Sequence, residues 1–249
     1  MSSTAFRPIR LSAMYHAHRA LGATFRDDGD WRVPDVYTAP REEAAKARAG
    51  VGLADMSACG KLSVRGEAVE AVLAKAAGVE RMGVATAERV RVDGARVLAA
   101  RLADDELLLL VPVAETAAVA EGLGKAAGGL GCAHVTDLTG GLAVVDLIGP
   151  RALELLARLS PLDLAAVPSL AVIPGELARV HATLIRLDRP PGPAFRAVVA
   201  REYGGFVWDA LAEAGRDLDL TPVGAAARAL LEGDALPSLG GPGPGEGGA

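Results

Sequence analysis

The stretch Arg48-Ala49-Gly50-Val51-Gly52-Leu53-Ala54-Asp55-Met56-Ser57-Ala58-Cys59-Gly60-Lys61-Leu62-Ser63-Val64-Arg65-Gly66 decides the fold that we expect for this chain. Its apolar residues form two short groups on either side of the segment 57–60, which predicts two strands joined by a tight connection. Helices are expected before and after them. One covers residues 40–50, with a proline and two glutamates in its first turn, and the other covers residues 67–77, just before a glycine.

The rest of the chain repeats this mixture of short strands and short helices. An N-terminal helix over residues 11–21 is followed by an expected surface loop that reaches Tyr37. Further strands are expected over residues 89–92, 97–102, 107–111, 134–138, 142–148, 170–173, 178–187 and 195–200, and further helices over residues 115–127, 150–159, 203–214 and 223–232. Strand-helix-strand-strand groups occur in both halves, which favours an α+β fold of two lobes built on antiparallel sheets.

Composition and charge exclude several classes of function. The net charge is -5 and no block of basic residues occurs, so the chain lacks the charge pattern of a nucleic-acid-binding protein. No apolar run approaches the roughly 20 residues that a membrane-spanning helix needs. The N-terminus lacks the features of a secretory signal, so we expect a cytoplasmic protein. No glycine-rich phosphate loop is present, and no nucleotide is expected.

The residue types that most often bind metals are scattered. Cys59 and Cys132 are too far apart in sequence for a metal-binding pair and are interpreted as core residues. On a helix, His16 and His18 would point to opposite sides, one toward the core and one toward solvent. We therefore expect no metal site. The glycine- and proline-rich segment 238–249 is expected to be disordered.

Several stretches resemble a known family. Residues 14–23 and 42–66 resemble the N-terminal signature of the glycine-cleavage T-proteins, which are folate-binding aminomethyltransferases. Near the other end, Leu220-Thr221-Pro222-Val223-Gly224-Ala225-Ala226-Ala227-Arg228 followed by Asp234-Ala235-Leu236-Pro237 is similar to the segment that closes the folate-binding module of that family. In between, the chain looks most like the small γ subunit of heterotetrameric sarcosine oxidase.

The resemblance implies two interlocked α+β lobes in one folate-binding module over residues 1–237, with the second lobe inserted over about residues 51–130. In full T-proteins a third, C-terminal domain follows, and this chain stops before it. The implied cofactor is tetrahydrofolate. Arg228 carries over as a partner for the glutamyl carboxylate of the folate, and Met56 and Cys59 are implied to lie at the pocket.

Three departures remove polar groups that the family carries. Ala76-Ala77-Gly78 stands where family transferases have an Asn-Asp pair, and Ala58-Cys59 stands for a His-Met pair. The loop 187–193 replaces the family's Gly-Tyr-Thr-Gly-Glu segment. A positioned acid or base contributes about 10² to 10⁴-fold to a rate, so such losses would cripple the chemistry.

Two functions follow from these departures. The first is a non-catalytic or degenerate family member that acts as a γ-like subunit and docks on a flavoprotein oxidase subunit or another one-carbon enzyme. The alternative is an active tetrahydrofolate-dependent aminomethyl or methyl transferase, in which another acid, Asp55 or Asp137, has taken over the lost role. Membership of a fold family alone does not decide between them.

Overall fold

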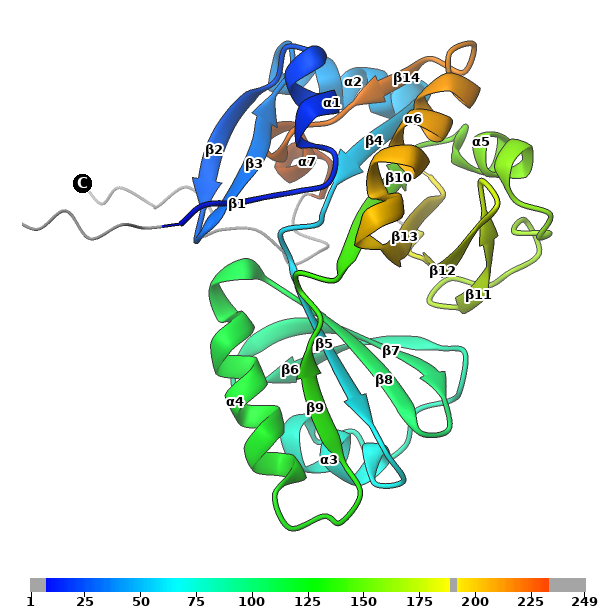
Figure 1. The fold of residues 1–249 in the computed structure, drawn as a ribbon. Coiled ribbons are helices and arrows are strands. Elements are labelled where there is room, and N and C mark those ends of the chain that lie inside the picture. The colour runs from blue at the N-terminus through cyan, green and yellow to red at the C-terminus, as the bar shows by residue number, and fades with distance from the viewer. Residues whose placement is uncertain (1–7, 189–191, 233–249) are drawn as a thin grey trace, which may run out of the picture.

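The computed structural model describes residues 8–188 and 192–232. Figure 1 shows two lobes, one above the other. The upper lobe holds a six-stranded sheet of order β11-β12-β13-β10-β4-β14. Its strands are β4 (Val51–Asp55), β10 (Leu142–Ile148), β11 (Val172–Leu177), β12 (Val180–Arg186), β13 (Ala194–Ala200) and β14 (Leu220–Pro222). The neighbours pair antiparallel, except that β14 runs parallel to β4.

The lower lobe holds a five-stranded antiparallel sheet of order β6-β7-β8-β5-β9. Its strands are β5 (Gly60–Arg65), β6 (Ala87–Val92), β7 (Ala95–Ala103), β8 (Glu106–Val111) and β9 (His134–Asp137). A small third sheet of order β1-β3-β2 adjoins the upper lobe, with β1 (Arg10–Leu11), β2 (Thr24–Asp28) and β3 (Trp31–Val36). The expected α+β class with mainly antiparallel sheets is confirmed.

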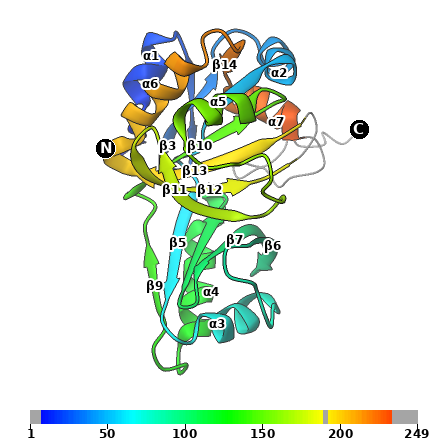
Figure 2. The same cartoon turned by 90° about the vertical axis from the view of Figure 1, so that its right-hand side faces the viewer.

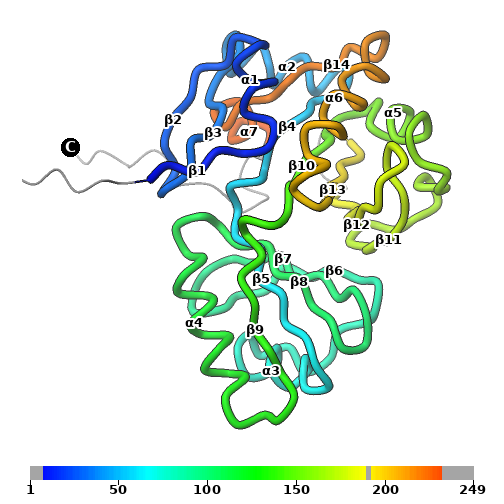
Figure 3. The backbone as a smooth tube through the Cα atoms, viewed as in Figure 1, coloured from blue at the N-terminus to red at the C-terminus, as the bar shows by residue number. Residues whose placement is uncertain are grey.

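The chain passes between the lobes twice, at neighbouring points. It leaves the upper sheet at the end of β4, forms β5, and returns from β9 into β10 (Figure 3). The two crossings lie side by side because β4 pairs with β10 in one sheet and β5 pairs with β9 in the other. The lower sheet is thus built from residues 60–137, whereas we expected an inserted lobe over about residues 51–130. The strand at 51–55 belongs to the upper sheet, because its apolar side chains complete that sheet's core.

Seven helices lie among the described residues: α1 (Tyr15–Ala20), α2 (Pro40–Ala49), α3 (Val69–Ala77), α4 (Thr116–Ala127), α5 (Ala152–Leu159), α6 (Gly204–Ala214) and α7 (Ala225–Glu232). Short 3₁₀ turns precede α4 and α6, at Val113–Glu115 and Arg201–Tyr203. The helix expected over residues 40–50 is confirmed, with Pro40 at its start and Gly50 at its end. None of the helices in the described residues is long and apolar enough to span a membrane.

Three main apolar cores hold these layers together. One lies between the upper sheet and helices α5 and α6, and a second lies between the lower sheet and helices α3 and α4. The third core lies between the two sheets and includes Met56, Cys59, Leu110 and Val198. Figure 2 shows the upper sheet resting directly on the lower lobe. Because the third core is buried between them, the two lobes pack against each other. Truncating a leucine of such a core to alanine lowers the free energy of unfolding by about 2 to 5 kcal/mol.

The N-terminal region differs from the sequence expectation. The helix is shorter than residues 11–21, because Arg10–Leu11 pairs with β3 as a strand. Residues 22–37 form the hairpin β2–β3 and not a loop, with its turn at Gly29 (φ 63°). The strand pattern was hidden because most side chains of this hairpin are only half-buried, while Trp31 and Pro34 alone in β3 are buried.

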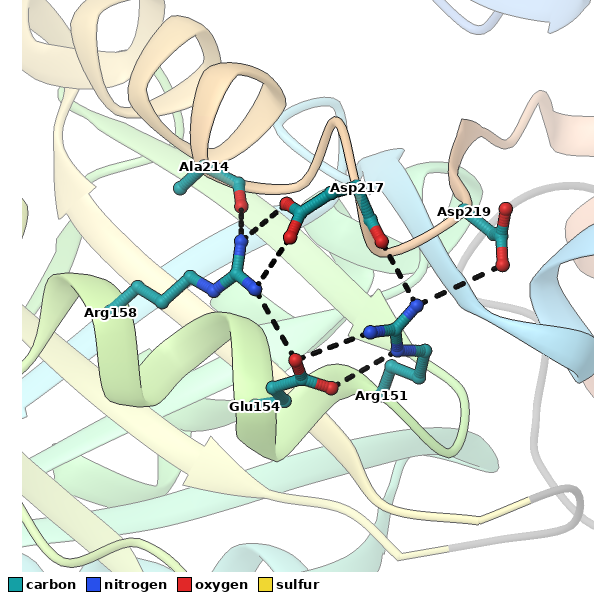
Figure 4. Close-up of polar contacts among 6 residues, drawn as sticks. All are labelled: Arg151, Glu154, Arg158, Ala214, Asp217 and Asp219. Carbon is teal, nitrogen blue, oxygen red and sulfur yellow. Dashed lines mark hydrogen bonds and ion pairs between the residues drawn. The ribbon is translucent and has the colours of Figure 1, made fainter.

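An ion-pair network fastens helix α5 to the segment that follows α6. Arg158 donates to both carboxylate oxygens of Asp217, at 2.5 and 2.9 Å, and to the backbone oxygen of Ala214 at 2.7 Å. Arg151 contacts Glu154 and the backbone oxygen of Asp217 (Figure 4). The network joins α5 to the end of α6 and to the segment that follows it, within the upper lobe.

Candidate functional site

Four of the five candidate residues line one hollow. It lies where strand β4 ends, beside the turn into β5 and helix α7, and its lining includes Asp55, Met56, Cys59 and Arg228. The fifth candidate, Asp137, does not belong to this hollow. The structure thus brings together residues that the sequence places more than 160 positions apart.

Asp137 lies on strand β9 and is exposed. Its carboxylate accepts the backbone N–H of Thr139 at 2.7 Å, which forms a local turn. The hydroxyl of Thr139 in turn accepts the backbone N–H of Lys61 at 3.0 Å. Asp137 therefore lies where the chain crosses from one lobe to the other, and it does not line the hollow.

Asp55 is a buried carboxylate with both oxygens engaged. Its Oδ2 lies 2.9 Å from Nε2 of His18, and its Oδ1 accepts the backbone N–H of Ser57 at 2.8 Å. Burial by itself raises the pKa of Asp55, but the hydrogen bond and the charge interaction with His18 and the further hydrogen bonds hold the pKa below its ordinary value. A carboxylate that is this acidic is a poor general base near neutral pH.

His18 continues the hydrogen-bond chain to Tyr37. The phenol oxygen of Tyr37 lies 2.9 Å from Nδ1 of His18. Burial, followed by the charges of Asp55 and Glu43, raises the pKa of Tyr37, so the phenol keeps its proton. Nε2 of His18 lies 2.9 Å from Oδ2 of Asp55, so the imidazole links the phenol to the carboxylate. The edge of the imidazole meets Trp208 with centroids 4.6 Å apart, which further fixes the ring.

Glu43 is a second buried carboxylate close to this network. Its side chain accepts the backbone N–H groups of Tyr37 and Thr38 at 2.7 and 2.9 Å, and that of Gly224 at 2.9 Å. Only 1% of Glu43 is exposed. Three backbone donors compensate for the burial of this side chain, and they join the start of α2 to the turn that precedes α7.

The turn before α7 requires a glycine. A Cβ atom on Gly224 would lie 2.1 Å from the backbone oxygen of Asp35, far inside contact distance. The close approach of these two backbones sets the start of α7 and so places Arg228, one turn later, at the hollow.

Lys61 is a buried cation that the sequence analysis did not single out. It lies in strand β5, its exposed fraction is 0%, and its Nζ donates to the backbone oxygen of Ser57 at 2.6 Å. The ammonium lies 5.6 Å from the ring centroid of Trp31, which provides a cation–π contact. Burial lowers the pKa of Lys61. The side chain fastens the β4–β5 turn against the N-terminal hairpin.

An ion pair buried in the upper sheet adds charge beside the hollow. Arg196 on β13 donates from Nε and Nη2 to the two oxygens of Asp146 on β10, both at 2.7 Å. The field of Arg196 and Arg228 reaches Cys59, but burial dominates and raises the pKa of that thiol. A buried, protonated thiol of this kind is chemically inert.

Sequence patterns could have revealed some of these residues. Asp146 and Arg196 are the single charged residues in two otherwise apolar strands, and their opposite signs would have suggested a cross-strand pair. His18 lies on the predicted apolar face of its helix, and we interpreted it only as a core residue. That position is confirmed, and His16 is exposed. Tyr37 and Glu43 gave no such signal.

The hollow around Arg228 is small. Its volume is about 20 Å³, which is room for about one water molecule. Sites for small molecules and cofactors usually measure about 300 to 1,000 Å³. Val113, Val223 and side chains of the β2–β3 hairpin complete its wall. The residues that the resemblance implies for folate binding are therefore together, but the space between them does not fit a folate.

No candidate metal centre occurs in residues 8–188 and 192–232. No group of three or more histidine, cysteine, aspartate or glutamate side chains there could hold an ion. The two remaining histidines, His134 and His181, lie on exposed positions of different sheets.

The curated proteins that are similar to this chain include aminomethyltransferases and a subunit of sarcosine oxidase. The aminomethyltransferase of Streptomyces coelicolor is 31% identical over 239 residues, which cover 93% of this chain and 63% of the relative. The sarcosine oxidase subunit alpha of a Corynebacterium species is 29% identical over 245 residues, which cover 87% of this chain and 25% of that subunit. This chain thus spans less than two thirds of the aminomethyltransferase that it matches.

Two solved structures share the fold. The glycine cleavage system aminomethyltransferase T of Bartonella henselae superposes with a TM-score of 0.80 at 21% identity, covering 90% of this chain and 62% of that chain. A heterotetrameric sarcosine oxidase from a Corynebacterium species superposes with a TM-score of 0.61 at 22% identity, covering 86% of this chain and 98% of that chain. Residues 14–236 match the family described as the GCVT N-terminal domain. The chain therefore belongs to the GCVT N-terminal domain family, within the group of aminomethyltransferase relatives.

Proposed function

We propose that this chain is a degenerate family member that acts as a γ-like subunit of a sarcosine-oxidase-type or one-carbon-transfer complex. The observation that carries the proposal is the small size of the hollow at Arg228. Its volume of about 20 Å³ leaves no space for a folate between the residues that the resemblance implies as its contacts.

The chemistry of the hollow supports the same proposal. Asp55 has a lowered pKa and both oxygens occupied, while Cys59 is a buried thiol with a raised pKa. Arg228 supplies a guanidinium, a group that donates hydrogen bonds and has no acceptor. None of these three groups is suited to general acid–base catalysis near neutral pH. On this proposal, the fold provides a surface that binds another protein.

The relatives support a role inside a complex. One relative is named as a subunit of sarcosine oxidase, and a heterotetrameric sarcosine oxidase shares the fold. The sarcosine oxidase relative is an alpha subunit. The γ-like assignment is therefore supported by the resemblance of the middle of this sequence to the γ subunit. We propose that the partner is the flavin-bearing part of an oxidase or another one-carbon enzyme.

The partner is tested by isolating the chain, carrying an affinity tag, from the organism that makes it. The proposal predicts that the chain elutes from a sizing column with a larger protein and that the fraction shows flavin absorbance. A cell line that expresses the tag alone is the control. Elution as a clean monomer from its own lysate would contradict a subunit role.

One observation favours the alternative, an active tetrahydrofolate-dependent aminomethyl or methyl transferase. Arg228 is only 5% exposed and lines the same hollow as Asp55 and Met56, where a partner for the glutamyl carboxylate of folate would lie. The hollow would have to widen to hold a folate, and side chains of the β2–β3 hairpin form part of its wall. This alternative predicts folate-dependent transfer above background that is lost in Arg228→Ala.

A further inference from the structure

Three arginines gather on one face of the β6–β7 hairpin. This hairpin lies at the edge of the lower sheet away from β9 (Figure 2). Arg91 on β6 and Arg96 on β7 are directly opposite each other in the strand register, so their side chains leave the sheet on the same face. Arg89 shares that face, because side chains alternate along a strand and Arg89 is two residues before Arg91. All three residues are exposed.

The arginines continue the face of the lower sheet that packs on the upper lobe. Ala87 and Leu98 lie on the same face of the hairpin, and both belong to the core between the two sheets. Val90 and Val92 lie on the other face, in the core with helices α3 and α4. The three arginines therefore lie at the margin of the contact between the lobes, where this face becomes exposed.

These charges have no counterpart in the described part of the chain. Within residues 8–188 and 192–232, none of the three arginines forms an ion pair. Arg91 donates from Nη1 to the backbone oxygen of Gly94 at 3.3 Å, which uses part of one guanidinium. A guanidinium has five N–H donors, so most donors of the cluster stay available to a partner.

The acids that are nearest in sequence point away from the cluster. Glu88 alternates with Arg89 and so faces the other side of the sheet. The carboxylate of Asp93 lies close against Gly122 on α4, where an added Cβ atom would meet it at 1.9 Å. Helix α4 packs on the face that carries Val90 and Val92, so Asp93 does not balance the arginines.

The arrangement destabilises the chain by itself. Like charges that are directly opposite in an antiparallel pair weaken a sheet. Although Arg89 is exposed, partial burial lowers its pKa, and the nearby charge of Arg196 lowers that pKa further. Arginine does not lose its proton in proteins, so the repulsion stays at every pH. A compensating negative charge must therefore come from outside the described chain.

The size and charge of the cluster favour carboxylates of a protein as that partner. The arginine fork binds a carboxylate through two parallel hydrogen bonds. Nucleic acid carries a continuous row of phosphates and calls for a longer basic track, whereas this chain has a net charge of -5. A short acidic segment needs only a few cations close together.

We propose that Arg89, Arg91 and Arg96 form a docking surface for an acidic, carboxylate-rich segment of another protein. The inference rests on the proposed subunit role, and it names the face and the chemistry through which the partner is held. The surface lies on the lower lobe and includes none of the residues that line the hollow at Arg228.

The first test measures binding of a fluorescein-labelled decaglutamate peptide to the full chain by fluorescence anisotropy. We expect saturable binding at low salt that weakens at about 0.15 M salt, because exposed charges are screened. The double variant Arg91→Gln/Arg96→Gln removes two exposed ion pairs with the peptide and should bind it about tenfold more weakly. Its melting temperature should be unchanged or slightly higher, because the repulsion between the two strands is relieved.

A charge-matched control separates the cluster from the overall charge. Arg41→Gln/Arg179→Gln removes the same charge from two exposed positions on the upper lobe and should leave peptide binding unchanged. No binding of the peptide, or equal weakening by the two double variants, would overturn the proposal. A clearly lower melting temperature of Arg91→Gln/Arg96→Gln would overturn it too, because the pair would then support the fold.

Other occupants of the surface give different results. Tighter binding of a labelled DNA oligonucleotide than of the peptide would overturn the proposal in favour of nucleic acid. A dimer of the pure chain that dissociates in Arg91→Gln/Arg96→Gln would overturn it in favour of a second copy.

Co-elution with the native partner separates this inference from the subunit role. We expect the wild type and the control variant to co-elute with the partner and Arg91→Gln/Arg96→Gln to lose it. Co-elution of that variant would overturn the docking surface and leave the subunit role standing. Elution of the wild type as a monomer would contradict the subunit role itself, and the inference with it.

Discussion

Asp146 and Arg196 face each other across strands β10 and β13 and share two hydrogen bonds of 2.7 Å, with only 2% and 4% of their side chains exposed. The pair lies on the side of the upper sheet that carries Val144 and Val198 of the third core. Such a buried pair adds little net stability over an apolar pair, but breaking it leaves an uncompensated charge. It therefore fixes the register of the two central strands.

The first prediction concerns this pair. Arg196→Met leaves the carboxylate of Asp146 buried without its main partner, and we expect the free energy of unfolding to fall by about 3 to 5 kcal/mol. Urea denaturation followed by circular dichroism measures the change. The double variant Asp146→Leu/Arg196→Met should recover most of the loss. A single variant as stable as Arg216→Ala, which breaks an exposed pair with Glu213, would contradict this role.

Acid unfolding should report on Asp55. The folded-state pKa of Asp55 is below its ordinary value of 3.8, so the carboxylate stabilises the fold above that pH, and the contribution is lost as the pH falls through the lowered pKa. Asp55→Asn removes the charge but keeps the shape, and at pH 7 it should cost about 1 to 3 kcal/mol. The difference from the wild type should shrink as the pH falls below 3.8 and through the lowered pKa. A difference that is constant with pH would contradict an ionised, His18-bound Asp55.

The turn before α7 predicts a strong dependence on one glycine. Gly224→Ala places a Cβ atom 2.1 Å from the backbone oxygen of Asp35, so α7 must shift and the melting temperature should fall clearly. The matched control is Gly124→Ala, within α4, where nothing lies within 4 Å of the added Cβ. That control should be neutral or stabilising by up to about 1 kcal/mol, because alanine favours helix. Equal effects of the two changes would refute the close backbone contact.

The network of Figure 4 predicts a second, weaker acid-sensitive contribution. The hydrogen bonds from Arg158 lower the pKa of Asp217 from 3.8 to about 2. The stabilisation is therefore complete above pH 3.8 and disappears as the pH falls through about 2. Because Asp217 is exposed, Asp217→Asn should lower the melting temperature only slightly at pH 7, and salt should reduce the difference. A salt-independent loss would show that packing, and not charge, is responsible.

The fold was largely predictable from periodicity. Helix α2 and strands β4 and β5 follow from proline, glycine and alternating apolar groups close together in sequence. The hairpin β2–β3 was not predicted, since many of its side chains are charged and most are not buried, so no alternation of apolar residues marks it. Its pairing depends on tertiary contacts around Trp31, which local sequence does not contain.

The candidate site was predictable only where the family resemblance named it. Met56, Cys59 and Arg228 do meet in one hollow. Lys61 and Glu43 were missed because charged residues are usually exposed. The burial of Glu43 depends on Gly224, far away in sequence, and that of Lys61 on Trp31 in the hairpin that was not predicted. The size of the hollow depends on the β2–β3 hairpin, which the sequence did not predict.

The most direct test of the account is a calorimetric titration of the folded chain with 5-formyltetrahydrofolate. The small hollow at Arg228 predicts no binding heat up to millimolar folate, in a sample whose folding is verified by its melting transition. Binding at micromolar strength, about -8 kcal/mol, that is lost in Arg228→Ala would contradict the account and would instead favour an active transferase.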